Sequence, residues 1–244
     1  MRNMIKVAAA ILLVMAAAFF AAAYKEHKPY REAEKSHTQL KDLVLYVEKE
    51  ENAQGRKIDF SLLQRINPEI AAWLYIPGTS IDYPVLIGET DTYYLKRDYK
   101  RSKSSLGAIF AFSDTSREMT DAHICLFGHN MKEPQMFGEL KKYMESEFAK
   151  KHEKLYLYMP ERTEVYRLCA AFSCEKTDAI FRHKMKAGSK EMEALTKRIA
   201  EKSKITTPET GKFCKAEKIL TLSSCSDYER TRMRTTVHFE KIVE

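Results

Sequence analysis

A cysteine, a histidine and an arginine occupy positions in this chain where nucleophilic chemistry is possible. Cys225 follows the apolar run 219–222, His129 follows the apolar run 123–127, and Arg234 precedes the last expected strand of the chain. A cysteine nucleophile needs a proton carrier or ion-pair partner, and a cation for the oxyanion that its attack creates. The chain has 5 cysteines and 7 histidines, so the presence of these residue types alone indicates little. Their positions at the ends of strand-like runs are what indicates a catalytic site.

Each of these residues has a functional and a structural interpretation. Cys225 as a thiolate would attack a carbonyl carbon, and His129 would carry the proton to and from an amine. Arg234 would donate two hydrogen bonds to the oxyanion without losing its charge. The structural alternatives are a buried strand cysteine, a hydrogen-bonded histidine and a surface arginine. His123 and His238 are weaker candidates, and we expect both to be structural.

Composition narrows the class of protein. The chain has 244 residues, 44% of them hydrophobic, and a net charge of +7 in which basic and acidic residues are interleaved. No basic stripe with interleaved aromatic residues appears, so we expect no nucleic-acid partner. No CxxC or Cys/His spacing indicates a metal, and no cofactor is expected. Apolar surroundings predict that three cysteines are small buried residues, whereas Cys214 lies in a polar stretch; the three are Cys125, Cys169 and Cys174.

The N-terminus predicts a membrane segment. Residues 7–24 carry no charge, which is about the length needed to cross a bilayer. One interpretation is a signal peptide cleaved after Ala21-Ala22-Ala23, and the other is an uncleaved single-pass anchor with the rest of the chain outside the cell. We therefore expect an anchor or signal segment over 1–24, a helical stem over 25–58 and a catalytic domain over 59–244.

Periodicity predicts a mainly β domain with a few helices. Proposed helices follow caps at Asp59 and Ser189, a third covers 136–148, and residues 50–57 are expected to form a loop. One helical face of the stem is predicted to carry Leu40, Leu43, Val44 and Val47. The expected strands cover 72–76, 81–87, 106–112, 123–128, 155–159, 165–172, 219–222 and 235–243. This pattern predicts a β-barrel or sandwich with a helix inserted before the strand that carries Cys225.

Several ordered motifs resemble the sortase family. Thr221-Leu222-Ser223-Ser224-Cys225 with a following arginine resembles the sortase signature TLxTC…R, and Phe127-Gly128-His129-Asn130-Met131 resembles the sortase histidine segment. Three further stretches are similar to class B sortases in particular; they are 67–79, 81–85, and Tyr93-Tyr94-Leu95 leading to Gly107-Ala108-Ile109-Phe110. The likeness covers roughly residues 59–244.

The resemblance implies an eight-stranded β-barrel on the outer face of a Gram-positive cell membrane. It implies a cysteine transpeptidase that cleaves a C-terminal sorting signal, NPxTx-like in many class B members, through a Cys thioester. The protein is then joined to a cell-wall amine, either oligoglycine or a diaminopimelate side chain. The expected partners are thus surface proteins with a sorting signal, a peptidoglycan precursor and the membrane. The implied catalytic set is His129, Cys225 and Arg234.

The sequence departs from the family pattern at two positions. Ser224 replaces the usual threonine before the cysteine, and Thr92 stands where many relatives have asparagine. The resemblance also implies substrate-binding roles for Ser223, Tyr93 and Tyr94, with Thr92 beside them.

The choice of arginine stays open between two residues. Arg230, Arg232 and Arg234 would share one face of an extended strand, so spacing does not decide between them. The family pattern around Val237 and His238 favours Arg234, with Arg232 as the alternative.

Two other functions are compatible with the same residues. The first is a secreted cysteine peptidase that uses water as the acceptor, and the mass of the product would separate it from a transpeptidase. The second is a non-catalytic module that binds the cell envelope, in which Cys225 would not react with a sorting-signal analogue.

Overall fold

The computed structural model describes residues 2–47, 56–131, 135–205, 217–225 and 232–242. The chain divides into two compact units, Met1–Asp42 and Leu43–Glu244, and each is described by itself.

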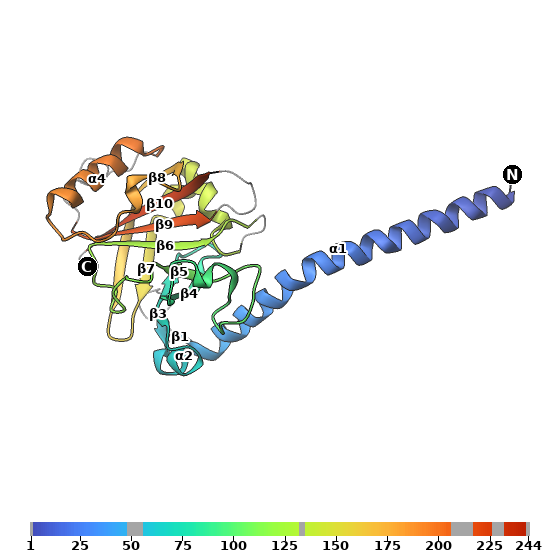
Figure 1. Cartoon of the computed structure of the whole chain (residues 1–244), viewed down its shortest axis with the longest axis horizontal. Coiled ribbons are helices and arrows are strands. Elements are labelled where there is room, and N and C mark those ends of the chain that lie inside the picture. The colour runs from blue at the N-terminus through green and yellow to red at the C-terminus, as the bar shows by residue number, and fades with distance from the viewer. Residues whose placement is uncertain (1, 48–55, 132–134, 206–216, 226–231, 243–244) are drawn as a thin grey trace. The chain divides into compact units, whose positions relative to one another are not determined.

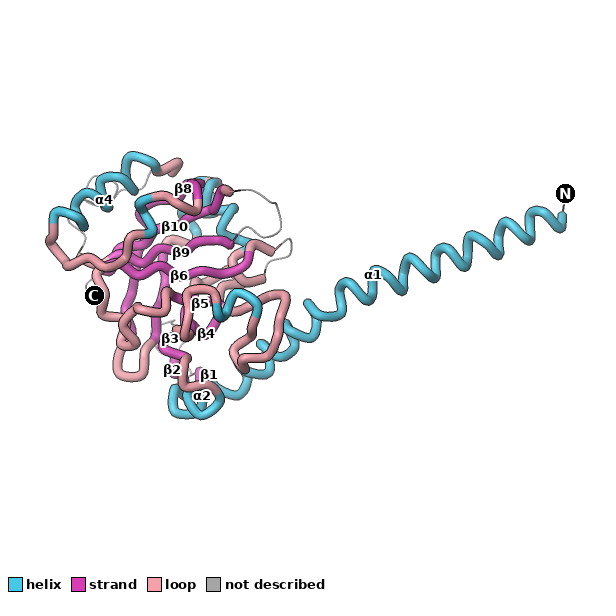
Figure 2. Tube along the Cα trace, in the orientation of Figure 1, coloured by secondary structure: helices cyan, strands magenta, loops and turns pink. Residues whose placement is uncertain are grey.

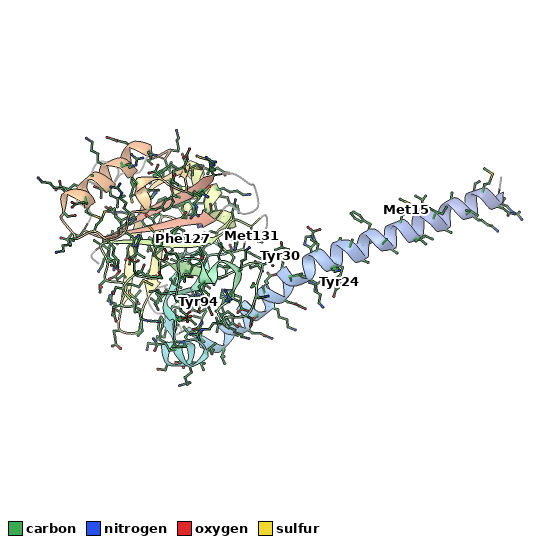
Figure 3. All side chains as sticks on the ribbon, in the orientation of Figure 1. Met15, Tyr24, Tyr30, Tyr94, Phe127 and Met131 are labelled. Atoms are coloured by element: carbon green, nitrogen blue, oxygen red, sulfur yellow. The ribbon has the colours of Figure 1, made fainter. Side chains whose placement is uncertain are left out.

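The N-terminal unit is helical. Helix α1 spans Arg2–Val44 and continues through Pro29. Its most apolar 18-residue window has a mean hydropathy of 2.4 and none of it is buried, so the helix is long and apolar enough to cross a membrane. Side chains along it, Met15 and Tyr24 among them, extend from the ribbon without neighbours of their own unit around them (Figure 3). The expected boundaries at residues 24 and 58 stay a prediction.

A short hairpin follows α1 and corrects two expectations. Strand β1 (Leu45–Val47) pairs antiparallel with β2 (Arg56–Ile58). Val47 is therefore in a strand and not on the helical face, and Arg56 and Lys57 are not in a loop. Arg56 forms an ion pair with Asp82 at 2.8 Å, and Asp82 also accepts a hydrogen bond from Trp73 Nε1 at 2.7 Å. This tertiary pairing holds a polar segment in extended form, which its residue types alone do not favour.

Eight strands within the described residues close into a barrel, in the order β10-β8-β7-β3-β4-β5-β6-β9. Their bounds are β3 Ile70–Tyr75, β4 Asp82–Leu86, β5 Ile109–Ala111, β6 His123–His129, β7 Lys154–Tyr158, β8 Thr163–Glu175, β9 Ile219–Cys225 and β10 Met233–Ile242. The pairs β4–β5 and β6–β9 are parallel, and the other neighbours are antiparallel. Figure 1 shows β6, β9, β10 and β8 running side by side.

Local sequence explains the tight connections. The β3–β4 turn uses Gly78, whose φ of +74° is a conformation that favours glycine. In the β7–β8 hairpin, Tyr158 pairs with Thr163 and the Met159 N–H donates to Arg162 O at 2.8 Å. The two parallel pairs need longer crossovers, and these carry the short helices.

The short helices of the second unit lie around the barrel (Figure 2). Asp59 caps α2 (Phe60–Ile66) and Ser189 caps α4 (Lys190–Lys202), because their side chains accept hydrogen bonds from backbone N–H groups. The helix expected over 136–148 is instead a 3₁₀ segment η3 (Gly138–Met144) and a separate α3 (Ser146–Lys151), divided at Glu145, whose backbone is extended. Two further 3₁₀ segments are η2 (Tyr93–Lys96) and η4 (Ala179–Phe181).

Helix α4 is the insertion before the strand that carries Cys225. Its apolar face is buried on β8 and β9 in a cluster that contains Met192, Leu195, Ile199, Phe172 and Ile219. The expected barrel with N-terminal helices and an inserted helix is confirmed.

Candidate active site

Parallel pairing of two strands brings two of the predicted catalytic positions together. In the β6–β9 ladder, His129 pairs with Cys225, although these residues are far apart in the sequence. Each residue ends its strand. The structure thus places the backbone of Cys225 directly beside that of His129, and it does not describe the Cys225 side chain.

The third predicted residue lies on the next strand. Strands β9 and β10 are antiparallel, and Ser223 pairs with Thr236. Two residues beyond this pair stand Cys225 on β9 and Arg234 on β10. Arg234 itself pairs with Cys174 on β8. His129, Cys225 and Arg234 therefore belong to three adjacent strands at the same level of the sheet.

A backbone carbonyl orients His129. The imidazole is 8% exposed, and its Nε2 lies 2.5 Å from Leu95 O, which belongs to η2. A carbonyl oxygen only accepts hydrogen bonds, so Nε2 must carry the proton of this bond. In the neutral ring the lone pair is then on Nδ1, which is the nitrogen left to take a proton.

Gly107 packs directly against the turn that supplies this carbonyl. The φ of Gly107 is +59°, and a Cβ on it would lie 2.6 Å from Leu95 O, 2.8 Å from Tyr94 O and 3.0 Å from His129 Cδ2. Glycine is required here both for its backbone conformation and for the close approach of two carbonyls.

Aromatic side chains support Arg234. Its guanidinium carbon lies 5.5 Å from the Phe127 ring centroid and 5.7 Å from that of Phe181, which is within the range of cation–π attraction. Arg234 is half-buried, whereas Arg232 is exposed in a bend beside the strand. Arg230 lies outside the described residues. The structure therefore gives Arg234 a supported position that Arg232 lacks.

The other described cysteines are not disposed for catalysis. Cys125, Cys169 and Cys174 are free and buried, and burial raises the pKa of each thiol, that of Cys174 to about 11. A raised pKa disfavours the reactive thiolate. The expectation that these three are buried is confirmed, and Cys214 lies outside the described residues.

The two serines before Cys225 differ in their contacts. Ser224 Oγ accepts a hydrogen bond from the Thr235 N–H at 3.0 Å and so ties β9 to β10 where threonine is usual in the family. The Ser223 hydroxyl is buried and has no hydrogen-bond partner within the described part of the chain.

The predicted substrate-binding residues near η2 divide into two kinds. Tyr94 is 1% exposed; its hydroxyl bonds Glu69 and also accepts from Asn67 Nδ2 at 2.8 Å, and burial raises its pKa to about 12. Thr92 is exposed, and Tyr93 is half-buried beneath the Arg97 guanidinium. Thr92 and Tyr93 are therefore accessible to a ligand, whereas Tyr94 is engaged inside the domain.

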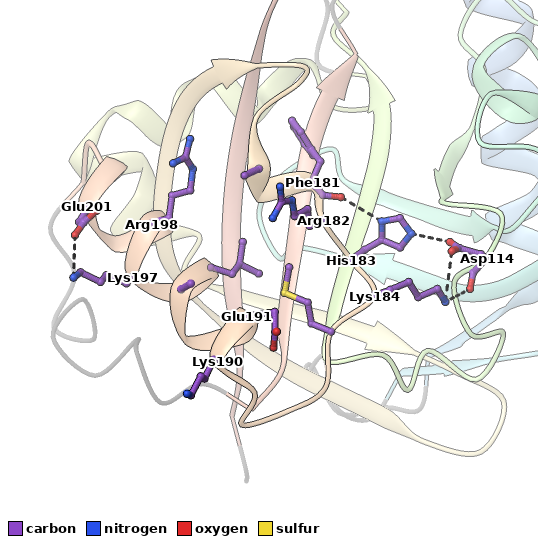
Figure 4. A pocket seen from close by; sticks show the side chains of 14 residues that line it. Asp114, Phe181, Arg182, His183, Lys184, Lys190, Glu191, Lys197, Arg198 and Glu201 are labelled. Carbon is purple, nitrogen blue, oxygen red and sulfur yellow. Dashed lines mark hydrogen bonds and ion pairs between the residues drawn. The ribbon is translucent and has the colours of Figure 1, made fainter.

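A pocket of about 1050 Å³ lies between α4 and the segment that follows η4 (Figure 4). His183 in this segment stacks on Phe112 at 4.0 Å and bonds Asp114 at 2.8 Å. Phe181 lines the pocket and also lies against the Arg234 guanidinium, but neither His129 nor Arg234 is among the lining residues.

Residue types did not reveal every residue that shapes this site. The Leu95 carbonyl and Phe181 were not expected as supports for His129 and Arg234. A backbone oxygen leaves no signal in the residue type, and an aromatic residue in an inserted segment is more often core. Among the described residues, no group of three or more His, Cys, Asp and Glu side chains could hold a metal ion.

Comparisons with known proteins agree with this geometry. A family model described as the sortase domain matches residues 74–242. The curated Sortase B of Listeria monocytogenes is 31% identical over 180 residues, which is 70% of each chain. Sortase B of Staphylococcus aureus is 26% identical over 73% of this chain and 72% of the relative.

Solved structures give the same result. Sortase B from Bacillus anthracis in complex with AAEK1 has a TM-score of 0.73 and 28% identity, over 89% of this chain and 99% of that one. A Staphylococcus aureus sortase B–substrate complex has a TM-score of 0.69 and 27% identity, over 75% of this chain and 84% of that one.

The barrel and these matches define a cysteine transpeptidase that sorts proteins to the cell wall. The chain belongs to the sortase family, within which its relatives are class B sortases. Sortases act at the cell surface, and the N-terminal apolar helix agrees with a membrane anchor.

Proposed function

We propose that Cys225, His129 and Arg234 carry out the transpeptidation, with an NPxTx-like sorting signal as the acyl donor. The observation that supports this most strongly is the pairing of His129 with Cys225 at the ends of two parallel strands. The Leu95 carbonyl holds the imidazole in one tautomer beside that position.

The first half-reaction forms a thioester. The Cys225 thiolate attacks the carbonyl carbon of the scissile peptide bond in the signal, and the Arg234 guanidinium donates to the oxyanion of the tetrahedral intermediate. The carbon–nitrogen bond then breaks, and His129, which starts as the imidazolium paired with the thiolate, gives its Nδ1 proton to the leaving amine.

The second half-reaction returns the enzyme to its starting state. An amine of the peptidoglycan precursor, oligoglycine or a diaminopimelate side chain, attacks the thioester carbon while His129 accepts its proton. The carbon–sulfur bond breaks, an amide forms, and the Cys225 thiolate is released. Thr92 and Tyr93, the accessible members of the predicted set, are proposed to contribute to binding of the signal, whereas the buried Tyr94 and Ser223 are not.

We also propose where the enzyme is located in the cell. Helix α1 would anchor the enzyme by a single pass, with the catalytic barrel outside the cell. Its clients would be surface proteins that carry a C-terminal sorting signal.

Product analysis tests this proposal. The full chain in detergent micelles is incubated with NPxTx peptides and either triglycine or diaminopimelate, and the products are identified by mass spectrometry. We expect a peptide joined to one of the amines, and no product with Cys225→Ala. Cleavage that yields only a free carboxylate would instead indicate a cysteine peptidase. No reaction together with an unreactive Cys225 would indicate a binding module.

A further inference from the structure

Two buried histidines lie on the strands that carry the proposed catalytic residues. His123 on β6 is 1% exposed and His238 on β10 is 0% exposed. His123 Nε2 lies 2.8 Å from Thr221 Oγ1, and the same oxygen lies 2.9 Å from His238 Nδ1. The chain of contacts continues from His238 Nε2 to Thr236 Oγ1 at 3.1 Å. At its other end, His123 Nδ1 lies 2.7 Å from Arg182 O.

The directions of these hydrogen bonds follow by elimination. Arg182 O only accepts, so His123 Nδ1 carries a proton and the Nε2 of the neutral ring is left as an acceptor facing the Thr221 hydroxyl. The Thr236 hydroxyl gives its one proton to Phe172 O at 3.1 Å, so Thr236 Oγ1 accepts from His238 Nε2–H and His238 Nδ1 is a second acceptor facing the Thr221 hydroxyl. Burial lowers the pKa of both histidines, that of His123 to about 4, so both rings are neutral near pH 7. The Thr221 hydroxyl, with one proton to donate, is therefore the group that both histidines share.

Both ends of this hydrogen-bond chain connect to Arg234 through neighbouring residues. One end is the carbonyl of Arg182, the residue after Phe181 in the sequence. The Phe181 ring lies against the Arg234 guanidinium. The Thr236 end of the hydrogen-bond chain lies two residues from Arg234 along β10, on the same face of the strand. In between, it crosses β6, β9 and β10, the three strands that carry His129, Cys225 and Arg234.

Arg234 needs such support because no carboxylate in the described part of the chain holds it. Within the described ranges of the chain, no Asp or Glu forms an ion pair with its guanidinium, which rests on Phe127 and Phe181. An unpaired guanidinium keeps its donors for an oxyanion, but its position then depends on the aromatic walls. A donor that stabilises a transition state must be held in place before the reaction.

We propose that His123, Thr221 and His238 are positioning residues that hold Arg234 in place, through Phe181 at one end and Thr236 at the other. This inference rests on the proposed function, in which Arg234 stabilises the oxyanion. It assigns a role in the reaction to histidines that lie too deep to touch a substrate.

Substitution at the centre of the hydrogen-bond chain tests the proposal. Thr221→Val keeps the shape of the side chain and removes the hydroxyl that both histidines share. We expect kcat for an NPxTx peptide to fall about 10-fold while KM changes less than about 2-fold, because only transition-state stabilisation is lost. Thr221→Ser, which restores the hydroxyl, should recover most of kcat.

Tyr166→Phe is the matched control. It also removes a buried hydroxyl from a hydrogen bond, to Glu164, but at the far end of β8, where Tyr166 pairs with Lys241. Tyr166→Phe should leave kcat unchanged, although we expect it to lower the thermal stability about as much as Thr221→Val does. If the folded Thr221→Val enzyme keeps the wild-type kcat, or loses no more than Tyr166→Phe does, the proposal is overturned.

A double-mutant cycle assigns the effect to Arg234. In an Arg234→Ala background, Thr221→Val should lower kcat no further, because the group that it positions is absent. An equal additional loss would contradict the proposal. Thr236→Val provides a second break in the chain if Thr221→Val does not fold, with the same expected result. Full activity in Cys225→Ala or Arg234→Ala would instead overturn the proposed function itself.

Discussion

At the scale of single residues, the Leu95 carbonyl determines which nitrogen of His129 carries its proton. The 2.5 Å contact to Nε2 leaves Nδ1 as the basic nitrogen of the neutral ring. Gly107 allows this arrangement, since any larger residue would meet Leu95 O and Tyr94 O.

We predict that Gly107→Ala lowers kcat by roughly 10- to 100-fold. The added Cβ would displace the carbonyl that orients His129, and misplacement of a catalytic group by about 1 Å can cost a factor of about 100. Steady-state kinetics with an NPxTx peptide measures the effect. Gly188→Ala is the matched control, because Gly188 has a φ of +70° but nothing within 4 Å of its added Cβ. Equal losses in both variants would mean that backbone strain, and not His129, is responsible.

The arginine assignment gives a second prediction. Arg234→Lys should lower kcat by about 10²–10³-fold, because an ammonium group cannot donate the paired hydrogen bonds of a guanidinium. Arg232→Lys should remain near the wild-type rate, since Arg232 is exposed beside the strand. Measurement of kcat for both variants tests this assignment. A larger loss in Arg232→Lys than in Arg234→Lys would assign the oxyanion role to Arg232.

The chemistry-bearing residues could be predicted from the sequence because their types and motifs are specific. The supports of the site could not be predicted in the same way. Leu95 acts through its backbone, and Phe181 is brought to Arg234 only by the fold of the inserted segment.

At the scale of elements, a buried ion cluster joins the strands that close the barrel. Glu164 on β8 accepts from Lys218 at 2.7 Å, just before β9, and from Lys241 on β10 at 2.9 Å. Burial alone would raise the pKa of Glu164, but hydrogen bonds from Lys218, Tyr166 and Lys241 outweigh it and lower the pKa to about 2. This cluster lies at the opposite end of β8 from Cys174 and Arg234.

We predict that Glu164→Gln destabilises the fold by roughly 3–5 kcal/mol, because it leaves the Lys218 ammonium buried without its carboxylate. The carboxylate stabilises the fold above pH 4.5 and loses this effect as the pH falls toward 2. Urea unfolding at pH 7 measures the loss. The kcat of the folded variant should be unchanged, and a lower kcat at full stability would contradict the separation of this cluster from the active site.

Elements with strong local signals were predicted well, and the others were corrected by tertiary contacts. The caps at Asp59 and Ser189 and the β7–β8 hairpin are confirmed. Strand β5 is shorter than expected because the left-handed Gly107 interrupts its first part. Strand β2 has no apolar alternation, and its pairing with β1 could not be inferred from residue types.

At the scale of the whole molecule, the two neutral buried histidines make the fold sensitive to acid. The unfolded chain binds protons at His123 and His238 below about pH 6.5, whereas the folded chain does not until much lower pH. Stability should therefore fall as the pH drops from 6.5 toward 4. The groups around His123 are Arg182 O, Thr221, Cys125 and His183, and those around His238 include Asp178 and Phe172.

We predict that each histidine contributes about 2 kcal/mol to the loss of stability between pH 7.5 and pH 5. Urea unfolding at the two pH values measures it, and His123→Asn should reduce the difference by that amount. His27→Asn, at an exposed position on α1, should leave the difference unchanged. An unaltered pH dependence in His123→Asn would show that His123 is already protonated in the folded protein at pH 5.

The central claim is that Cys225 forms the covalent intermediate of this sortase, and the mass of the intact protein tests it most directly. The full chain is mixed with an NPxTx peptide without any amine, quenched in acid within the first turnover and analysed before and after proteolysis. We predict an added mass equal to the acyl fragment of the peptide, located on the fragment that contains Cys225, released by hydroxylamine and absent in Cys225→Ala. An adduct that persists in Cys225→Ala, or that lies on another cysteine, would contradict the account.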